Sequence, residues 1–248
     1  MRVAAIYDIH GNLPALEAAL HAIRRTGVDH VVVGGDVLPG PMPCETIDRL
    51  MNIELSVQFI HGNGDREALS WMRGHETTTI PEPYRESMRW VARQLRPEDE
   101  AELARWPPTL RLEVPGVGEV LFCHATPRND TEIFTRLTPD ERLLPIFDTL
   151  GVPLVVCGHT HMQFDRVIGR TRVVNAGSVG MPFGATGAYW LLLGPGVQLR
   201  RTDYDLERAA ARIRATKYPQ AEAFAAGNVL QAPSEAAILE SFTRAELR

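Results

Sequence analysis

The sequence contains a single lysine, Lys217, and the rest of its 26 lysine and arginine residues are arginines. A Walker-type phosphate loop needs a Gly-Lys-Ser/Thr sequence, so this class of nucleotide site is excluded. Cysteine is also scarce, because Cys44, Cys123 and Cys157 lie far apart and form no CxxC pair. We therefore expect neither a thiolate zinc site nor a disulfide framework, and we interpret Cys123 and Cys157 as buried, reduced thiols.

Long apolar runs are missing as well. The first apolar run covers about five residues and ends at Asp8, which is too short for the core of a signal peptide. No other run approaches the roughly 18 apolar residues of a membrane-spanning helix. The net charge is -5 and no basic stripe is present. We therefore expect a cytoplasmic protein that binds neither membranes nor long nucleic acids.

The first third of the chain alternates strands, loops and helices. Apolar runs at 3–7, 30–33 and 56–60 predict buried strands, and apolar residues at helical spacing follow the first two. Asn12 is positioned to cap the first of these helices. A glycine and polar residues follow each strand. Open α/β sheets bind ligands at these carboxyl ends of their strands, so we expect a site there.

The remainder of the chain is predicted from hairpin and helix signals. Residues 66–109 are predicted to form a helical insert that covers one side of the site, with helices at 86–95 and 97–106. A hairpin at 110–123, a helix at 138–150 and a strand at 154–157 follow. Four short strands at 164–167, 172–175, 188–193 and 197–202 are typical of an antiparallel meander. Helices at 205–215 and 234–243 complete what we expect to be one domain, residues 1–248.

Seven polar residues gather at or just after the predicted strand ends: Asp8, His10, Asp36, Asn63, His124, His159 and His161. Imidazole and carboxylate together suit Mn, Fe, Zn, Ni or Co, whereas Ca and Mg prefer oxygen ligands alone. Seven protein ligands are too many for one catalytic ion that keeps an open position, so the set favours two divalent ions sharing a carboxylate. Such a centre attracts a phosphate ester and brings the pKa of bound water toward neutral.

In their order along the chain, these residues resemble the signature of the calcineurin-like metallophosphoesterase superfamily. The matching motifs are Asp8-Ile9-His10, Gly35-Asp36, Gly62-Asn63-Gly64-Asp65, His124 and Gly158-His159-Thr160-His161. The stretch Asn175-Ala176-Gly177-Ser178 is similar to the Asn-Pro-Gly-Ser of the small bacterial and archaeal members. The resemblance therefore points to the small prokaryotic branch of this superfamily.

The resemblance implies an α/β fold of two packed mixed β-sheets flanked by helices, a four-layer α-β-β-α arrangement. It also implies roles for the seven residues: the first metal is held by Asp8, His10 and His161, the second by Asn63, His124 and His159, and Asp36 bridges both. Asp36, Asn63 and His124 are then the candidate catalytic residues. The implied activity is hydrolysis of phosphomonoesters, small phosphodiesters or both by attack of a metal-bridging hydroxide. We expect two divalent ions as cofactors, and Mn is the metal we favour.

One position departs from the family pattern. Where the family has histidine in Gly-Asn-His-Asp/Glu, this chain has Gly64. In the family that histidine is thought to protonate the leaving oxygen or to steady the phosphate. A general acid is typically worth about 10²–10⁴-fold in rate. We therefore expect aryl phosphates or activated diesters to be better substrates than alkyl phosphates.

Three further side chains are candidates for substrate binding. Arg66 and Arg128 follow metal-loop residues and could bind phosphate oxygens, although an ion-paired surface arginine is an equal interpretation of Arg66. Asn12 could contact substrate, but a helix cap is the simpler interpretation. Asp65 could orient a metal ligand or cap its loop. His61 is interpreted as a packing residue.

Other activities on the same fold remain open. A nucleotide phosphodiesterase or a protein phosphatase would use the same chemistry, and the superfamily also includes a non-catalytic scaffold, a retromer subunit that binds partners. Because all seven ligand positions are filled here, we favour an enzyme acting on a small phosphorylated substrate. The sequence leaves the oligomeric state open, with a homodimer as one expectation.

Overall fold

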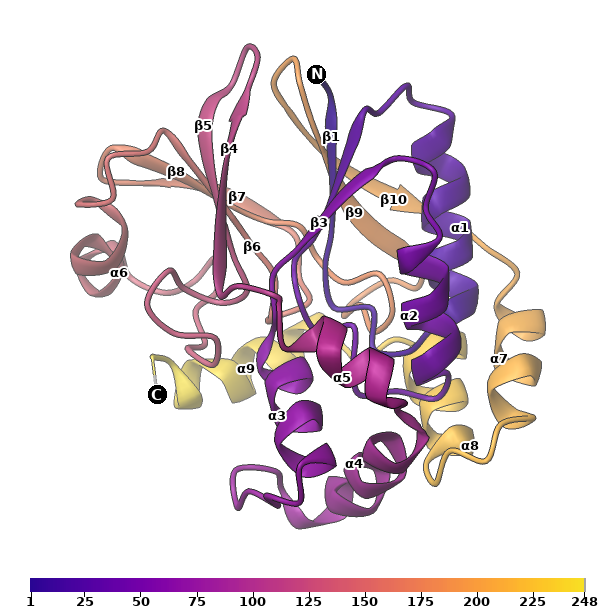
Figure 1. Ribbon diagram of the computed structural model, residues 1–248. Coiled ribbons are helices and arrows are strands. Elements are labelled where there is room, and N and C mark those ends of the chain that lie inside the picture. The colour runs from indigo at the N-terminus through magenta and orange to yellow at the C-terminus, as the bar shows by residue number, and fades with distance from the viewer. Residues whose placement is uncertain (248) are drawn as a thin grey trace.

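In the computed structural model, which describes residues 1–247, two five-stranded β-sheets stand side by side (Figure 1). The first sheet consists of β1 (Val3–Ile6), β2 (His30–Val33), β3 (Ser56–Phe59), β9 (Ala188–Leu193) and β10 (Val197–Thr202). The second consists of β4 (Thr109–Val114), β5 (Gly118–Cys123), β6 (Leu154–Cys157), β7 (Phe164–Ile168) and β8 (Thr171–Asn175). Each sheet therefore combines strands from distant parts of the chain.

Both sheets are mixed. The first has the order β10-β9-β1-β2-β3, in which β1, β2 and β3 are parallel and β9 and β10 are antiparallel to their neighbours. The second has the order β4-β5-β6-β8-β7, in which β5, β6 and β8 are parallel. The parallel strands occupy the middle of the second sheet and one side of the first, where β3 is the edge strand. Their carboxyl ends therefore open at the same edge of the molecule.

Helices cover the outer faces of the two sheets. α1 (Leu13–Arg24) and α2 (Pro43–Met51) pack on the first sheet, and α6 (Asp140–Phe147) packs on the second. Apolar side chains fill three layers: between the first sheet and its helices, between the two sheets, and between the second sheet and α6. Tyr7 and Phe122 are among the largest fully buried side chains of the middle layer. This is the predicted four-layer α-β-β-α fold.

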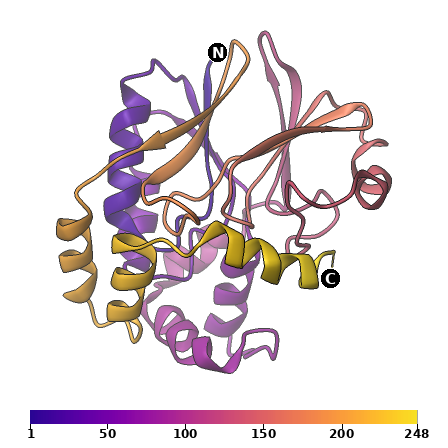
Figure 2. The ribbon, with the colours of Figure 1, turned by 180° about the vertical axis from the view of Figure 1, so that it is seen from behind.

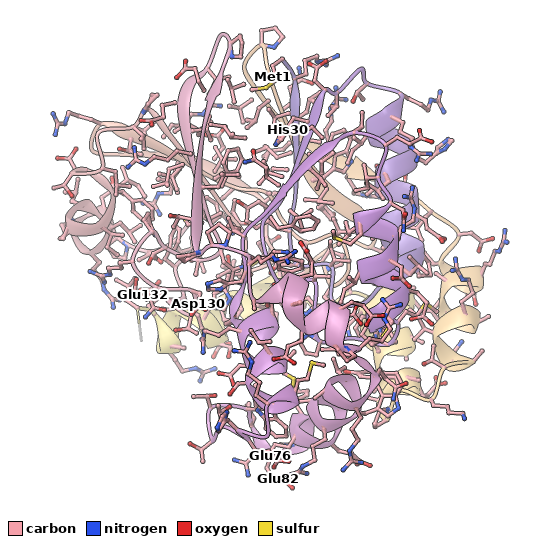
Figure 3. The ribbon with its side chains drawn as sticks, in the orientation of Figure 1. Met1, His30, Glu76, Glu82, Asp130 and Glu132 are labelled. Carbon is pink, nitrogen blue, oxygen red and sulfur yellow. The ribbon has the colours of Figure 1, made fainter. Side chains whose placement is uncertain are left out.

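A second set of helices lies at the carboxyl ends of the parallel strands. It consists of α3 (Asn63–Met72), α4 (Glu82–Gln94), α5 (Pro97–Leu103), α7 (Leu206–Arg214), α8 (Ala221–Phe224), the π-helical segment η1 (Ala225–Leu230) and α9 (Glu235–Ala245). Figure 2 shows α9 passing beneath the sheets toward the second sheet. There Glu246 accepts hydrogen bonds from Thr138 Oγ1 and Arg142 Nη1, both at 2.6 Å. Figure 3 shows Met1 and His30 at one end of the molecule and Glu76 and Glu82, in the helical part, at the other.

Two predictions about the elements were wrong. The strands predicted as one antiparallel meander are two hairpins in different sheets, and β8 pairs in parallel with β6. Hairpin signals report pairing between neighbours in sequence, whereas the partner of each hairpin is set by tertiary packing. The loop at 62–65 is also partly helical, because α3 begins at Asn63. No helix of residues 1–247 has the length and apolar character needed to cross a membrane.

Candidate metal centre

Loops at the carboxyl ends of the parallel strands carry the predicted ligands. Asp8 and His10 follow β1, Asp36 follows β2, and α3 opens after β3. These loops are joined by backbone hydrogen bonds, since Asp8 N donates to Gly35 O at 3.0 Å and His10 N donates to Asp36 O at 2.9 Å. The loops after β5 and β6 are joined in the same way. The ligand positions are therefore fixed relative to one another by main chain.

The backbone of these loops is strained. Asp8, His10, Asp36, His159 and His161 have positive φ values between 48° and 65°. Apart from Leu247, no other non-glycine residue of the described chain has positive φ. This conformation is costly for residues with a Cβ atom, and such strain concentrates at functional sites. The strain turns the side chains of the candidate ligands toward a common centre.

One group of side chains contains Asp8, His10 and His161. Their ligand atoms all lie within 4.8 Å of one another. His161 Nε2 lies 3.4 Å from Asp8 Oδ1, and it lies 3.2 Å from His10 Nε2. The group is buried, with Asp8 fully inaccessible. Two imidazoles and a carboxylate at these separations match a site for a transition-metal ion.

A second group contains Asp36, His124 and His159, with Asn63 beside them. Asp36, His124 and His159 also have ligand atoms within 4.8 Å of one another. One terminal atom of the Asn63 amide lies 3.2 Å from His124 Nε2 and 3.0 Å from His159 Nδ1. With nitrogen in that place the amide donates to both rings, and with oxygen there it completes a set of ligands facing a cation. The structure thus brings all seven predicted ligands together.

Three backbone carbonyls fix the orientation of the histidine rings. His124 Nδ1 lies 3.0 Å from Gly34 O, His161 Nδ1 lies 2.8 Å from Met181 O, and His159 Nε2 lies 3.2 Å from Thr131 O. Each carbonyl requires a proton on the ring nitrogen that faces it. In the neutral ring the other nitrogen, which points at the centre, then carries the lone pair. This is the arrangement in which histidine binds metals.

The residues present fit two cations by a further criterion. Asp8 Oδ1 is buried and has no hydrogen-bond partner among the described residues. Its other carboxylate oxygen accepts a hydrogen bond from His159 N at 2.9 Å. A buried acceptor without a partner is costly, and a cation at this oxygen would satisfy it. Asp36 lies between the groups: Oδ2 is 3.7 Å from His10 Nε2 and Oδ1 is 3.5 Å from His124 Nε2.

In the second group the pKa values of the two histidines are shifted in opposite directions. Burial opposes charge on His124, but the carboxylates of Asp36 and Asp8 outweigh it and raise the pKa of His124 to about 10. Burial, and then the charge of His124, lower the pKa of His159 to about 4. Burial would raise the pKa of Asp36, yet the imidazolium of His124 holds it well below its usual range. Without metal, a proton therefore occupies the place of one cation.

Comparison with known proteins decides the family. The sequence model of the calcineurin-like phosphoesterase superfamily domain matches residues 1–193. The chain belongs to the calcineurin-like phosphoesterase superfamily. This match confirms the predicted family and the predicted class of enzyme, a hydrolase that acts on phosphoesters.

Two individual relatives are similar to the chain. The chain is 25% identical to the uncharacterized protein MJ0912 of Methanocaldococcus jannaschii over 88% of this chain and 94% of that one. It is 32% identical to the phosphodiesterase YfcE of Escherichia coli over 90 residues, which cover 33% of this chain and 48% of YfcE.

Solved structures share the fold. The hypothetical protein PH1004 of Pyrococcus horikoshii superposes with a TM-score of 0.77 at 22% identity, covering 90% of this chain and 97% of that one. A metallophosphoesterase of Sphaerobacter thermophilus superposes with a TM-score of 0.71 at 23% identity, covering 91% and 97%. These likenesses confirm the predicted fold.

Gly64, which stands where the superfamily has histidine, is closely packed. A Cβ atom on Gly64 would lie 2.3 Å from Leu38 O and 2.9 Å from Pro39 Cδ. Gly64 N donates to Asp36 Oδ1 at 2.7 Å. The loop that carries Asp36 thus occupies the space into which a side chain at position 64 would extend. Gly64 supports this carboxylate through its backbone and supplies no acid.

Asp65 fixes the same two loops. Its Oδ1 accepts from Leu38 N at 2.9 Å and its Oδ2 accepts from Gly62 N at 3.0 Å. Burial, and then the charge of Asp36, raise the pKa of Asp65 to about 7. Both carboxylate oxygens are engaged with main chain. Asp65 therefore positions the loops that carry Asp36 and Asn63.

The predicted substrate-binding residues lie in two environments. Arg66 forms a bidentate ion pair with Asp130 at 2.7 and 3.0 Å, and Arg128 pairs with Glu132 at 2.7 Å. Both arginines line a polar cavity of about 440 Å³ that His124 also lines. Figure 3 shows Asp130 and Glu132 in the loop that approaches α3. Their contact with substrate stays a prediction.

Asn12 is fully buried. Its Oδ1 accepts from Ala15 N at 3.3 Å, which caps α1, and its Nδ2 donates to Gly180 O at 2.8 Å. These contacts support the capping interpretation, and binding of substrate by Asn12 stays a prediction. Phe183, which from the sequence alone could wall the site, stacks its ring on His161 with centroids 5.1 Å apart. No motif marks it, because a lone aromatic residue in a loop resembles many packing residues.

Proposed function

We propose that the protein is a dinuclear metal-dependent hydrolase of phosphomonoesters, small phosphodiesters or both. One observation carries this proposal: the two carboxylate oxygens of Asp36 face different ligand groups, at 3.7 Å from His10 Nε2 and 3.5 Å from His124 Nε2. A carboxylate in this position suits the bridge of a two-metal centre. Such centres clamp the attacking and leaving oxygens of a phosphoryl group.

The residues divide the work in the following way. Asp8, His10 and His161 would hold one divalent ion, Asn63, His124 and His159 the other, and Asp36 would bridge them. When bound, the ions lower the pKa of water toward neutral and polarise the phosphoryl oxygens. The carbonyls behind His124, His159 and His161 hold one proton on the far nitrogen of each ring, so that in the neutral ring the nitrogen facing the centre is the one that can bind an ion. The main-chain bonds between the loops hold the ligands preorganised for the reaction.

The metal and the cellular context are part of the proposal. Mixed imidazole and carboxylate ligands support Mn as the resident ion, with Fe, Ni, Zn or Co as alternatives. We propose a small phosphorylated substrate in the cytoplasm, without membranes or long nucleic acids as partners. The acidic net charge of -5 supports the exclusion of long nucleic acids.

The missing acid at position 64 bears on the choice of substrate. The packing of Leu38 O against Gly64 leaves no room there for a proton donor. Esters whose leaving group needs no protonation, such as aryl phosphates and activated diesters, are then the preferred substrates. A glycerol phosphate turned over as fast as a nitrophenyl ester would contradict this preference.

The activity is tested with nitrophenyl phosphate and bis-nitrophenyl phosphate on protein loaded with Mn. Wild-type protein should release nitrophenol, and Asp36→Ala should abolish release because both ligand groups lose the carboxylate they share. Asp203→Ala is the matched control, because it removes an exposed carboxylate (83% exposed) that is not one of the candidate ligands. Retained activity in Asp36→Ala would refute the two-metal proposal.

Diesters are the favoured substrates within this proposal. Relatives that match part of the chain include the phosphodiesterase YfcE. Two cavities adjoin the ligands, one at His124 and the other at His10 and Asp36. A diester has two substituents on phosphorus, so each can occupy one cavity. A ratio of diester to monoester turnover below one would contradict this preference.

A further inference from the structure

A second cavity, of about 630 Å³, opens beside the candidate ligands His10, Asp36 and Asn63. It extends away from them between α4 and the C-terminal helical segments, a region visible at the lower side of the molecule in Figure 1. A volume of this size holds a small molecule. Because its inner end is formed by candidate ligands, a phosphate bound at the centre would direct one substituent into the cavity.

The wall of this cavity is apolar. It includes Tyr84, Met88, Phe183, Phe224 and Ile238, and the exposed surface inside is mostly carbon. Apart from His10 and Asp36, its described lining residues carry no charged side chain. A charged substituent would lose water here without gaining a partner of opposite charge. The wall therefore selects against polyphosphate chains.

The other cavity differs in this respect. Its lining contains Arg66, Arg128 and Asp130, as well as threonines and an asparagine. The contrast separates a polar side of the centre from an apolar side. An ester with one apolar group has a preferred orientation across the two.

Aromatic side chains continue from the centre into the apolar cavity. The ring of Phe183 stacks on His161 with an interplanar angle of 22°, and Phe183 in turn packs edge-on to Phe242 at 6.1 Å. Tyr218 and Phe224, on the opposite wall, have their rings at 87° and 6.3 Å. Rings in such arrangements bind a further ring by offset stacking or edge contacts. The cavity is thus suited to a flat aromatic group rather than to a flexible chain.

Part of this wall lies beyond the part of the chain that the family model matches. The family match ends at residue 193, whereas Tyr218, Phe224 and Ile238 follow it. One of these segments is the π-helical stretch Ala225–Leu230, which places Asn228 at the cavity. π-Helical turns are rare and occur frequently at functional sites. The C-terminal part of the wall is therefore built from segments that follow the shared phosphoesterase domain.

We propose that the apolar cavity binds an uncharged aromatic group of the substrate, esterified to the phosphate held at the metal centre. The proposal rests on the proposed function and names its substrate class: a phosphoester of an aryl or heteroaromatic alcohol, or a diester carrying such a group. The aromatic group lies against Phe183, Phe224 and Tyr84. The phosphate lies at His10, Asp36 and Asn63.

The test uses phosphonates, because their carbon–phosphorus bond is not hydrolysed and leaving-group reactivity plays no part. Binding of 1-naphthylmethylphosphonate, octylphosphonate and methylphosphonate to the Mn-loaded full chain is measured by calorimetry. Burial of a bicyclic ring is expected to make the naphthyl compound about 10- to 100-fold tighter than the methyl compound. Equal affinities of the naphthyl and methyl compounds, or an octyl compound as tight as the naphthyl one, would overturn the proposal.

Two variants locate the effect. Ile238→Glu places a charge in the apolar wall, and Tyr84→Ala removes a side chain that is 57% exposed, so folding is not at stake. Each variant should reduce the ratio of naphthylmethylphosphonate affinity to methylphosphonate affinity by about fivefold or more. The affinity for methylphosphonate itself should not change. Val167→Glu makes a comparable change on β7, where the side chain is 62% exposed, and should leave the ratio unchanged. A wild-type ratio in Ile238→Glu would overturn the assignment.

Turnover of bis-nitrophenyl phosphate, measured on the same samples, separates this proposal from the proposed function. Turnover together with equal phosphonate affinities overturns the aromatic site and leaves the hydrolase standing. A strong naphthyl preference without any turnover overturns the hydrolase and supports the aromatic site.

Discussion

The strand-end loops and the helical cover of this molecule are built in different ways. The loops carry the candidate ligands, five of the seven on strained main chain, and hydrogen bonds between neighbouring loops fix them. The cover, made of α3 to α5 and the segments from α7 to α9, presents mostly apolar side chains to the cavity. The loops and α3 to α5 lie within the family match, whereas α7 to α9 lie beyond it.

This difference indicates that the loops determine the chemistry and that the helical cover determines the choice of substrate. Changes in the loops alter charge and geometry within a few ångströms of the centre, so they should affect metal binding and kcat. Changes in the cover alter the fit of one substituent, so they should act on substrate choice and KM. Variants of the two regions therefore form a direct comparison.

Apart from the bridging Asp36, the largest effect is expected from Asp8→Ala. Asp8 Oδ1 is the buried carboxylate oxygen without a hydrogen-bond partner among residues 1–247, so its removal deletes the ligand most dependent on a cation. We expect kcat/KM for bis-nitrophenyl phosphate to fall at least about 10³-fold, mainly through kcat. Asp140→Ala, on the exposed surface of α6, is the control. A loss of kcat/KM below tenfold in Asp8→Ala would contradict the view that the loops, rather than the helical cover, determine the rate of the reaction.

The change of metal affinity with pH should be the next largest effect after that of Asp8→Ala. The carboxylates around His124 raise its pKa to about 10 without metal, so its proton must leave before Nε2 can bind an ion. His159, with a pKa of about 4, releases no proton in this range. Mn affinity should thus rise by about tenfold per pH unit between pH 6.5 and 8.5 and weaken as pH falls. Titration in metal buffers measures this slope, and a flat profile would contradict the account.

Gly64→Ala tests the close packing within the loops. The added Cβ would meet Leu38 O at 2.3 Å, so the loop that carries Asp36 must shift. A displacement of about 1 Å near reacting groups can cost about 10²-fold in rate, and we expect a loss of 10- to 100-fold in kcat. Gly227→Ala, where a Cβ meets nothing within 4 Å, is the matched control. Wild-type kcat in Gly64→Ala would show that this contact has no role.

The smallest effect is expected from Arg128→Ala in the polar cavity. The Arg128 side chain is 54% exposed and already paired with Glu132, so its loss should raise KM about threefold and leave kcat unchanged. Arg170→Ala, 83% exposed and paired with Asp148, is the control. Steady-state kinetics with a diester checks this. A tenfold loss in kcat would instead place Arg128 at the reacting atoms.

The contrast between loops and cover also explains what the sequence could predict. A strand followed by glycine and a ligand residue is a local pattern, and so the positions of Asp8, His10 and Asp36 could be read directly. The partner sheet of β8 and the π-helical stretch after α8 depend on contacts distant in sequence, and no local pattern specified them. The stacking of Phe183 on His161 was unpredictable for the same reason.

Packing also explains the departure from the family pattern at position 64, which the sequence shows without a cause. The sequence showed glycine at position 64 in place of the usual histidine. The structure explains it, because Leu38 O lies where a side chain would begin. Such a contact involves residues 26 positions apart and follows from the course of the loop after β2.

The central claim is that Asp36 joins two metal sites in one centre. The most direct test is the metal content of the chain, purified without chelators, equilibrated with Mn and measured by elemental analysis against protein concentration. The account predicts two tightly held ions per chain, each lost on Asp36→Ala. One ion or fewer per wild-type chain would contradict it.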